Sequence, residues 1–302
     1  MNNNKSIFTN TIFVALAALL CCALWGSATP FIKTGYKLLL PVNNTPSIIL
    51  FAGIRFVICG SVITLFAKNK GKRMTMEKNE LGLVLAVGIF AVILHYTFTY
   101  SGLALTDSSI TALIKQLGGF VFIPLSFLFF KEDKFAINKL LGAVCGFGGL
   151  VVLKLTPTGI RFGLGEVLVI LASLCMVASN VLGKKVMKTV DSIVMTGYSQ
   201  LFGGIILVFI GLVGSGNMGN VNMKAIMVFA YICTASIWGY CIWNQLVSRN
   251  NLSQLFIVKF LEPMFAALFG AVLLNEDVFN IRFLLALMFT GGAVVISNME
   301  KK

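Results

Sequence analysis

Long apolar runs separated by short polar segments recur from one end of the chain to the other. A helix crosses the roughly 30 Å hydrocarbon core of a bilayer with about 20 predominantly apolar residues. The runs are continuously apolar and do not alternate with a period of two, which favours helices over the strands of a membrane barrel. The pattern therefore predicts ten membrane-spanning helices, near residues 11–33, 47–67, 81–101, 108–130, 136–154, 164–184, 192–213, 225–247, 253–274 and 281–298.

The composition supports the same class of protein. Hydrophobic residues make up 58% of the 302 residues and charged residues 12%, and the mean hydropathy is +0.92. Soluble chains carry about 25% charged residues. The longest polar interruption is the basic segment 68–78, which is too short for a soluble domain. We expect an all-α polytopic membrane protein that is surrounded by the lipid bilayer.

The positive charges predict how the helices are oriented. If the first loop lies outside, 15 lysines and arginines fall on inner segments and 6 on outer segments, as the positive-inside rule requires. This distribution predicts a multi-pass protein of the cell membrane with both termini in the cytoplasm. It also explains the net charge of +13 without a nucleic-acid partner. Residues 1–30 resemble a signal peptide, but the many further spans favour an uncleaved first helix.

The second half of the chain repeats the first half at a spacing of 144 residues. Matching pairs include Ser109 and Ser253, Lys115 and Lys259, Glu132 and Glu276, Asp133 and Asp277, Phe135 and Phe279, and Gly148 and Gly292. Because each half has five predicted spans, an odd number, the second half would enter the membrane from the opposite side. We predict two inverted five-helix repeats, residues 1–156 and 157–302. Inverted repeats are typical of secondary transporters, which bind a solute between the halves.

Three motifs carry a family resemblance: WGSATPFIK at residues 25–33, IRF at 54–56 and LEPMFAALFGAVLLNED at 261–277. With these motifs the chain resembles the ten-helix EamA-type members of the drug/metabolite transporter (DMT) superfamily over essentially its whole length. The resemblance implies a central cavity lined mainly by spans 1, 3, 4, 6, 8 and 9, and export or exchange of small organic metabolites. The chain departs from the family in the fourth span, where Gly118 and Gly119 replace an early proline.

Two lysines at corresponding positions of the repeats lie inside predicted spans, Lys115 in the fourth and Lys259 in the ninth. A lysine at the centre of a spanning helix costs about 2.5–3.5 kcal/mol on insertion scales, and such residues face a cavity by default. We therefore predict that both lysines bind a carboxylate or phosphate of the solute. The chain is similar in this respect to plastid sugar-phosphate translocators of the same superfamily, which use basic residues on the corresponding helices. The alternative is that both side chains extend to the nearest interface.

Two titratable groups are candidates for carrying a coupling proton. Glu262 is the only carboxylate clearly within a predicted span, and it lies three residues after Lys259, where it can form an intrahelical ion pair of purely structural importance. Pro263 follows and permits a kink at this point. His95, the single histidine, lies deep in the third span and is predicted to bind solute or a proton. The alternative for His95 is a neutral ring bonded to a neighbouring helix.

Aromatic and neutral polar residues complete the predicted cavity. Tyr96 and Tyr240 are one repeat apart and are expected to face it from equivalent helices. Such residues suit organic solutes, although tryptophans also serve as interfacial anchors and polar residues also join helices. Arg55, opposite Gln200 in the repeat with a shift of one residue, is expected to bond helix-end carbonyls or a lipid phosphate. Further candidates for solute binding are Trp25, Trp238, Asn244, Ser179 and Asn180.

Together these features predict a secondary transporter, either an exporter or an exchanger, for a small organic metabolite that bears a carboxylate or phosphate. An exporter of amphipathic or aromatic amino acids is the alternative within this class. An integral-membrane enzyme would need clustered carboxylates or histidines, whereas ten of the eleven acidic residues lie in loops or at span ends. The seven cysteines have no CxxC spacing, so we expect no metal site, no disulfide framework and no cofactor. A GxxxG motif at Gly142 and Gly146 leaves both a monomer and a homodimer open.

Overall fold

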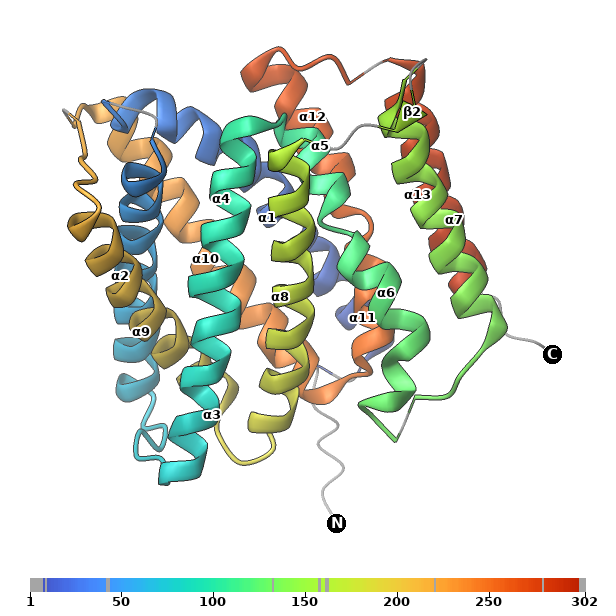
Figure 1. Ribbon diagram of the computed structural model, residues 1–302. Coiled ribbons are helices and arrows are strands. Elements are labelled where there is room, and N and C mark those ends of the chain that lie inside the picture. Colours follow the sequence, from blue (N-terminus) through green and yellow to red (C-terminus); the bar gives the residue numbers. More distant parts are fainter. Residues whose placement is uncertain are drawn as a thin grey trace.

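Helices make up almost all of the structure, a computed structural model in which residues 8, 10–41, 44–131, 133–156, 159–160, 163–219, 221–278 and 280–298 are described. Figure 1 shows these helices standing side by side as a bundle. The strands within these ranges form one short antiparallel hairpin of β1 (Leu155–Thr156) and β2 (Gly159–Ile160). Glu132 and Phe279 of the repeat, and both ends of the chain, lie outside the described residues.

Eight helical segments of the described chain are long and apolar enough to cross a membrane. Five of them are single α-helices: α1 (Thr11–Leu39), α2 (Thr45–Asn69), α8 (Leu164–Val186), α9 (Ser192–Val213) and α10 (Met223–Arg249). Three are built from several pieces. The first joins α3 (Lys78–Gly88) to α4 (His95–Leu105) through the π-helix η2 (Ile89–Leu94). The others are α5 (Ser108–Ile114) with α6 (Leu117–Leu125) and the 3-10 helix η3 (Ser126–Leu128), and α11 (Leu252–Lys259) with α12 (Glu262–Leu274). Two further helices, α7 (Ile137–Lys154) and α13 (Ile281–Asn298), pack together at one edge of the bundle (Figure 1).

The outward faces of the helices are apolar. Ile12 on α1, Phe209 on α9 and Val272 on α12 are 72%, 65% and 72% exposed. A contiguous apolar surface of this kind is stable in lipid and not in water. The predicted class, an all-α polytopic membrane protein, is thus confirmed. The count of ten spans stays a prediction, because α7 and α13 are not among the eight candidates and α13 offers only the shorter apolar helix Ile281–Ala293.

Asparagine and aspartate side chains begin five of the helices. Each accepts a hydrogen bond from a backbone N–H of the first turn, where helices have no internal acceptor. These caps let a helix start directly at the end of a short loop, so little chain lies outside the bundle. The capping residues are Asn10 of α1, Asn44 of α2, Asp191 of α9, Asn222 of α10 and Asn251 of α11.

Glycines bring α2 and α9 into close contact along their length. A Cβ at Gly60 of α2 would lie 2.3 Å from the backbone nitrogen of Leu201, and a Cβ at Gly204 of α9 would lie 2.5 Å from that of Val57. Backbones approach this closely only where no side chain stands between them. Because α2 carries Arg55 and α9 carries Gln200, this packing fixes the positions of two polar residues on one side of the bundle.

Two of these segmented spans are interrupted at Lys115 and Lys259, the lysines at corresponding positions of the repeats. Lys115 caps the end of α5, and Lys259 is the last residue of α11. Turns at residues 115–116 and 260–261 follow, after which α6 and α12 begin. Discontinuous helices in inverted-repeat transporters place polar groups near the middle of the membrane. Both ammonium groups are therefore held where a helix is interrupted.

The two breaks have different local causes. Pro263, in the first turn of α12, lacks the N–H that would continue α11 into α12, so the predicted kink is a full break. The break between α5 and α6 occurs without a proline. There, Gly118 permits close packing on α8, since a Cβ at this residue would lie 2.4 Å from the carbonyl oxygen of Ser173.

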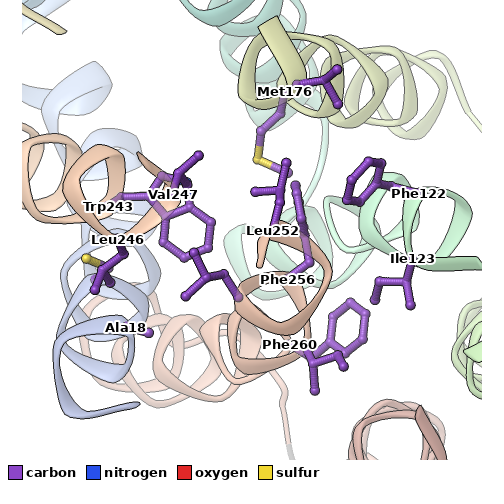
Figure 2. Packing of buried hydrophobic residues seen from close by; sticks show 14 of the residues in the cluster. Ala18, Phe122, Ile123, Met176, Trp243, Leu246, Val247, Leu252, Phe256 and Phe260 are labelled. Atoms are coloured by element: carbon purple, nitrogen blue, oxygen red, sulfur yellow. The ribbon is translucent and has the colours of Figure 1, made fainter. Parts of the chain in front are cut away.

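Aromatic side chains pack around α11 and hold the second break in place. Figure 2 shows Phe256 and Phe260 between the side chains of α6, α8 and α10. The ring centroids of Phe256 and Phe122 are 5.3 Å apart, and those of Phe260 and Phe120 are 4.3 Å apart. Buried rings at such separations contribute beyond the area that they bury. The segment that carries Lys259 is therefore part of an apolar cluster that includes side chains of both halves.

We predict that Gly60→Ala lowers the stability of the purified protein, because the new methyl group would displace the backbone of α9. Overpacking of this kind costs about 1–3 kcal/mol. Gly82→Ala is the matched control, since a Cβ at Gly82 meets no atom within 4 Å and alanine favours a helix. Thermal unfolding in detergent measures both variants. Equal unfolding temperatures for Gly60→Ala and the wild type would contradict the packing.

Candidate functional site

The helices surround a central cavity of about 70 Å³. None of the side chains that line this cavity is exposed. Three cations contribute to its wall: Arg55 of α2, Lys115 and Lys259. The lining also includes residues of α1, α4, α8, α9 and α10. The resemblance implied a lining by spans 1, 3, 4, 6, 8 and 9. The wall extends beyond these, because α2 (the second predicted span) and α9 (the seventh) also take part.

Lys259 lies in an aromatic environment inside this cavity. Its side chain is 4% exposed, and its ammonium nitrogen lies 4.8 Å from the ring centroid of Trp25, 5.2 Å from that of Trp243 and 5.8 Å from that of Phe256. Its hydrogen bond goes to the sulfur of Met176. Within the described chain, no carboxylate oxygen lies within 4.0 Å of it. Lys259 therefore faces the cavity, and the alternative of extension to the interface is wrong for this residue.

Lys115 has the carboxylate partner that Lys259 lacks. Its ammonium donates to Oε1 of Glu262 at 2.9 Å, and the carboxylate side chain is fully buried. The expected intrahelical pair of Lys259 with Glu262 is wrong, because the break at residues 260–261 makes Glu262 the first residue of a new helix. Its carboxylate then points across to α5. A negative charge in the first turn is also favoured by the dipole of α12.

His95 lines the cavity and also contacts a neighbouring helix, and its binding of solute or a proton stays a prediction. The ring lines the cavity, and its Nδ1 lies 2.8 Å from the carbonyl oxygen of Ala172 on α8. A neutral ring with its proton on Nδ1 donates this bond and keeps Nε2 as an acceptor. A π-helical turn, Ile89–Leu94, directly precedes His95, and such turns often accompany functional residues.

The two tyrosines of the repeat meet at the centre of the cavity. The hydroxyl oxygens of Tyr96 and Tyr240 are 2.6 Å apart, and both residues line the cavity. The ring of Trp25 lies 5.3 Å from that of Tyr240, measured between centroids. Aromatic side chains from α1, α4 and α10 thus form a continuous wall next to Lys259.

Three neutral polar candidates line the cavity, and each forms a hydrogen bond within the protein. Asn180 accepts from Nε1 of Trp243 at 2.7 Å. Asn244 donates to Oγ1 of Thr196 at 2.8 Å, and Ser179 donates to the carbonyl of Met176 at 2.8 Å. These side chains therefore fix the positions of their neighbours as well as presenting polar atoms.

Trp238 does not belong to the site. Its side chain is 59% exposed on the outer face of α10 and is absent from the cavity lining. The prediction that it binds solute is wrong, because Tyr240 and Trp243 occupy the inward face of the helix and Trp238 points to the opposite face. A residue two positions before Tyr240 on a helix is rotated by about 200° from it.

Arg55 and Gln200 are two of the polar cavity residues that the sequence did not place at the site. Arg55 is 1% exposed and donates from Nε to Oγ of Ser236 at 2.9 Å, and its guanidinium also bonds the hydroxyl of Tyr100. The expected bonds to helix-end carbonyls or a lipid phosphate are therefore wrong. Gln200, its counterpart in the repeat, also lines the cavity. A charged residue eight positions into a span could have indicated a place at the cavity for Arg55, whereas a single neutral glutamine gave no such indication.

Two sets of hydrogen bonds, here called clasps, join the two halves, one centred on Glu276 and one on Asp133. At one end, Glu276 accepts hydrogen bonds from the backbone N–H and the hydroxyl of both Ser108 and Ser109, at 2.7–3.0 Å. Lys33 lies 3.9 Å from the same carboxylate. At the other end, Asp133 accepts from Asn251 at 2.6 Å and from the Ser253 hydroxyl at 3.0 Å. Each clasp ties the start of a broken helix in one half to an acidic loop of the other half.

A helical membrane protein built around a closed polar cavity has the architecture of a solute transporter. The profile of the EamA-like transporter family matches residues 12–155 and again residues 163–298. The chain belongs to this family, and the resemblance seen in its motifs is confirmed.

Relatives along the whole chain are named as transporters. An uncharacterized transporter of Synechocystis sp. is 26% identical over 301 residues, which cover 92% of this chain and 88% of that protein. A protein of Escherichia coli named as a probable amino-acid metabolite efflux pump is 26% identical over 294 residues, which cover 92% of each chain. A crystal structure at 16% identity covers 96% of this chain and 97% of its own with a TM-score of 0.74, which supports the fold. The protein is thus a DMT-superfamily transporter and not an enzyme.

We predict that Glu262→Gln destabilises the protein by roughly 3–5 kcal/mol, the usual effect of removing one partner of a buried ion pair. Lys115 would then be left without its carboxylate. The double variant Lys115→Met with Glu262→Gln should recover stability relative to Glu262→Gln alone, whereas Lys259→Met with Glu262→Gln should not. Thermal unfolding of all variants as double-mutant cycles measures the coupling. Coupling of Glu262 to Lys259 and not to Lys115 would overturn the assigned pair.

The clasp at Glu276 predicts a pH-dependent contribution to stability. Burial raises the pKa of this carboxyl, but the hydrogen bonds from Ser109 and Ser108 outweigh burial and hold the pKa below its ordinary value of 4.5. Since the pKa is lower in the folded state, the stabilisation is fully present above pH 4.5 and is lost as the pH falls through the folded pKa.

Glu276→Gln should therefore unfold at a lower temperature than the wild type at neutral pH, and this difference should shrink in acid. Asp277→Asn is the matched control, because Asp277 is exposed and adjacent. Unfolding temperatures measured between pH 7 and pH 3 test the prediction. A difference that stays constant across this range would contradict a role for the ionised carboxylate.

Proposed function

We propose that this protein is a secondary transporter that moves a small organic anion across the cell membrane by alternating access. The carboxylate or phosphate of the solute binds the ammonium of Lys259. The observation that carries the proposal is that Lys259 lines the cavity at 4% exposure while no carboxylate of the described chain lies within 4.0 Å of it. A buried charge of this kind calls for a counter-charge.

The charges around the cavity support an anionic solute. Arg55, Lys115 and Lys259 contribute three positive charges, and Glu262 contributes one negative charge that Lys115 already uses. In a medium of low dielectric constant, attraction between these cations and an anion is much stronger than in water. Binding of the anion thus compensates charges that the protein holds in place before the solute arrives.

The aromatic wall suits the organic part of the solute. Trp25, Tyr96 and Tyr240 line the cavity next to Lys259, and flat rings contact apolar groups over a large area. His95, Asn180, Asn244 and Ser179 line the same cavity and are proposed to contact polar substituents. Trp238 has no part in this proposal.

The two clasps support alternating access. Both are made in this structure, and in the proposed cycle this arrangement is the closed state between two open ones. In the proposed cycle the halves 1–156 and 157–302 act as inverted repeats and the clasps open in turn, that of Glu276 outside and that of Asp133 in the cytoplasm. This assignment of sides follows from the predicted orientation, in which both termini are cytoplasmic.

Glu262 and His95 are the proposed carriers of a coupling proton. Protonation of Glu262 would break its ion pair with Lys115 and free a second cation for the solute. His95 is connected to α8 through Ala172, so a change in its protonation would act on that helix. Such coupling would let a proton gradient drive transport, and its absence would leave an exchanger or a facilitator.

An exporter of amphipathic or aromatic amino acids is the second candidate. The Escherichia coli relative named as a probable amino-acid metabolite efflux pump favours it. An amino acid would place its carboxylate at Lys259 and its side chain against Trp25 and Trp243, whose centroids lie 4.8 Å and 5.2 Å from the ammonium. Both candidates share the anion anchor and differ in the remainder of the solute.

We predict that Lys259→Met weakens binding of carboxylates and phosphates by about 1–3 kcal/mol, the value of a hydrogen bond to a charged group. The protein should stay folded, because methionine fills the same space among aromatic rings. Lys70→Met is the control for loss of a surface charge. Ligand-induced shifts of the unfolding temperature over a panel of amino acids, carboxylates and phosphates measure binding. Unchanged shifts in Lys259→Met would refute the anchor.

We also predict that Glu262→Gln abolishes accumulation driven by a pH gradient in proteoliposomes while exchange of internal and external solute persists. The reason is that glutamine keeps the shape of the side chain but cannot exchange a proton. His95→Gln should shift the pH optimum. Full gradient-driven accumulation in both variants would exclude proton coupling through these residues.

A further inference from the structure

We infer that Gln200 of α9 and Thr99 of α4 are uncharged contacts for the solute, here called the second subsite, which select anions that carry hydroxyl or amide groups away from Lys259. The inference rests on the proposed function, because it takes the anion anchor as one end of the solute. It adds the chemical class of the other end.

The side chain of Gln200 is buried without partners. It is 2% exposed, it lines the cavity, and neither its amide oxygen nor its amide nitrogen has a hydrogen bond. Thr99 is 4% exposed and also lines the cavity with an unpaired hydroxyl oxygen. Polar groups buried in proteins almost always have partners, and an unpaired one weakens the fold. These three unpaired atoms lie on α9 and α4, and Nε1 of Trp25 in the same cavity is also unpaired. We take them to indicate that a ligand supplies the missing bonds.

Neighbouring polar residues do not share this property. Ser199 donates to the carbonyl oxygen of Thr196 at 3.1 Å, and the Thr196 hydroxyl donates to Ser192 at 2.6 Å and accepts from Asn244. The unpaired state of Gln200 is therefore specific to that residue and is not a general feature of the inner face of α9.

Gln200 and Lys259 lie on different sides of the cavity. Gln200 is on α9, which packs on α2, α3 and α10, whereas Lys259 is on α11, which packs on α1, α6 and α10. Figure 1 shows α9 and α11 on opposite sides of α8. The close glycine contacts between α2 and α9 make the wall that carries Gln200 rigid. A single solute that satisfies both groups has to extend across the cavity.

The chemistry of the subsite limits what it accepts. An amide and a hydroxyl each donate and accept hydrogen bonds, so a hydroxyl or a primary amide of the solute satisfies them. Arg55 lies on α2 of the same wall and disfavours an ammonium group. A methyl group would leave the buried polar atoms unpaired, and sites of this type reject such analogues strongly.

The test uses matched carboxylates on the purified full-length protein. Wild-type unfolding temperatures are measured with a series of ω-hydroxy, ω-carbamoyl and ω-methyl carboxylates of increasing chain length, and with glutamine and norleucine as an amino-acid pair. We expect the hydroxyl or carbamoyl member of at least one matched set to bind about tenfold more tightly than the methyl member. Equal affinity within every matched set would overturn the inference.

The variants separate the subsite from the anchor. Gln200→Met and the isosteric Thr99→Val should each reduce the tenfold preference toward unity while the methyl analogue still binds. Thr64→Val is the control, because the Thr64 hydroxyl is also buried and unpaired but is not part of the cavity lining. A preference that survives in both Gln200→Met and Thr99→Val contradicts the subsite. Carboxylate binding by Lys259→Met tests the anchor alone. Loss of that binding supports the anchor, persistence contradicts it, and neither result bears on the subsite.

Discussion

The ion pair between Lys115 and Glu262 joins the broken helix of the first half of the chain to the broken helix of the second half. Inside a bilayer neither charge is stable alone, since a buried ion needs a counter-charge or a set of hydrogen bonds. The pair neutralises Lys115 and leaves Lys259 with aromatic faces and a sulfur atom as its neighbours. The cavity lining is therefore positive, because it contains Arg55, Lys115 and Lys259, and the carboxylate nearest to Lys115 lies outside the lining.

Helix interruption makes this arrangement possible. In a continuous helix Glu262 would lie one turn from Lys259 and could pair with it. The break at residues 260–261 redirects the carboxylate to Lys115, and the aromatic packing of Phe256 and Phe260 holds the break in place. Lys115 and Glu262 lie in different halves, so in the proposed cycle movement of one half against the other would change the distance between them.

Much of the fold could be predicted because apolar run length and repeat spacing are properties of the sequence itself. The position of Lys115 and Lys259 at the cavity and the meeting of Tyr96 with Tyr240 also followed from the repeat. The partner of Glu262 could not be predicted, because the rule for neighbours on a helix assumes that the helix continues. The outward orientation of Trp238 depends on how α10 is rotated, and the unpaired state of Gln200 depends on which polar atoms find partners. Neither property is encoded in local residue types.

The three tryptophans offer the most direct measurement of the central claim, that Lys259 binds an anion between Trp25 and Trp243. In a Trp238→Phe background both remaining tryptophans line the cavity, and 4-bromobenzoate would quench their fluorescence on binding. The account predicts saturable quenching that unbrominated benzoate reverses and that Lys259→Met shifts to higher bromobenzoate concentrations. Quenching that does not saturate, or that is unchanged in Lys259→Met, would contradict it.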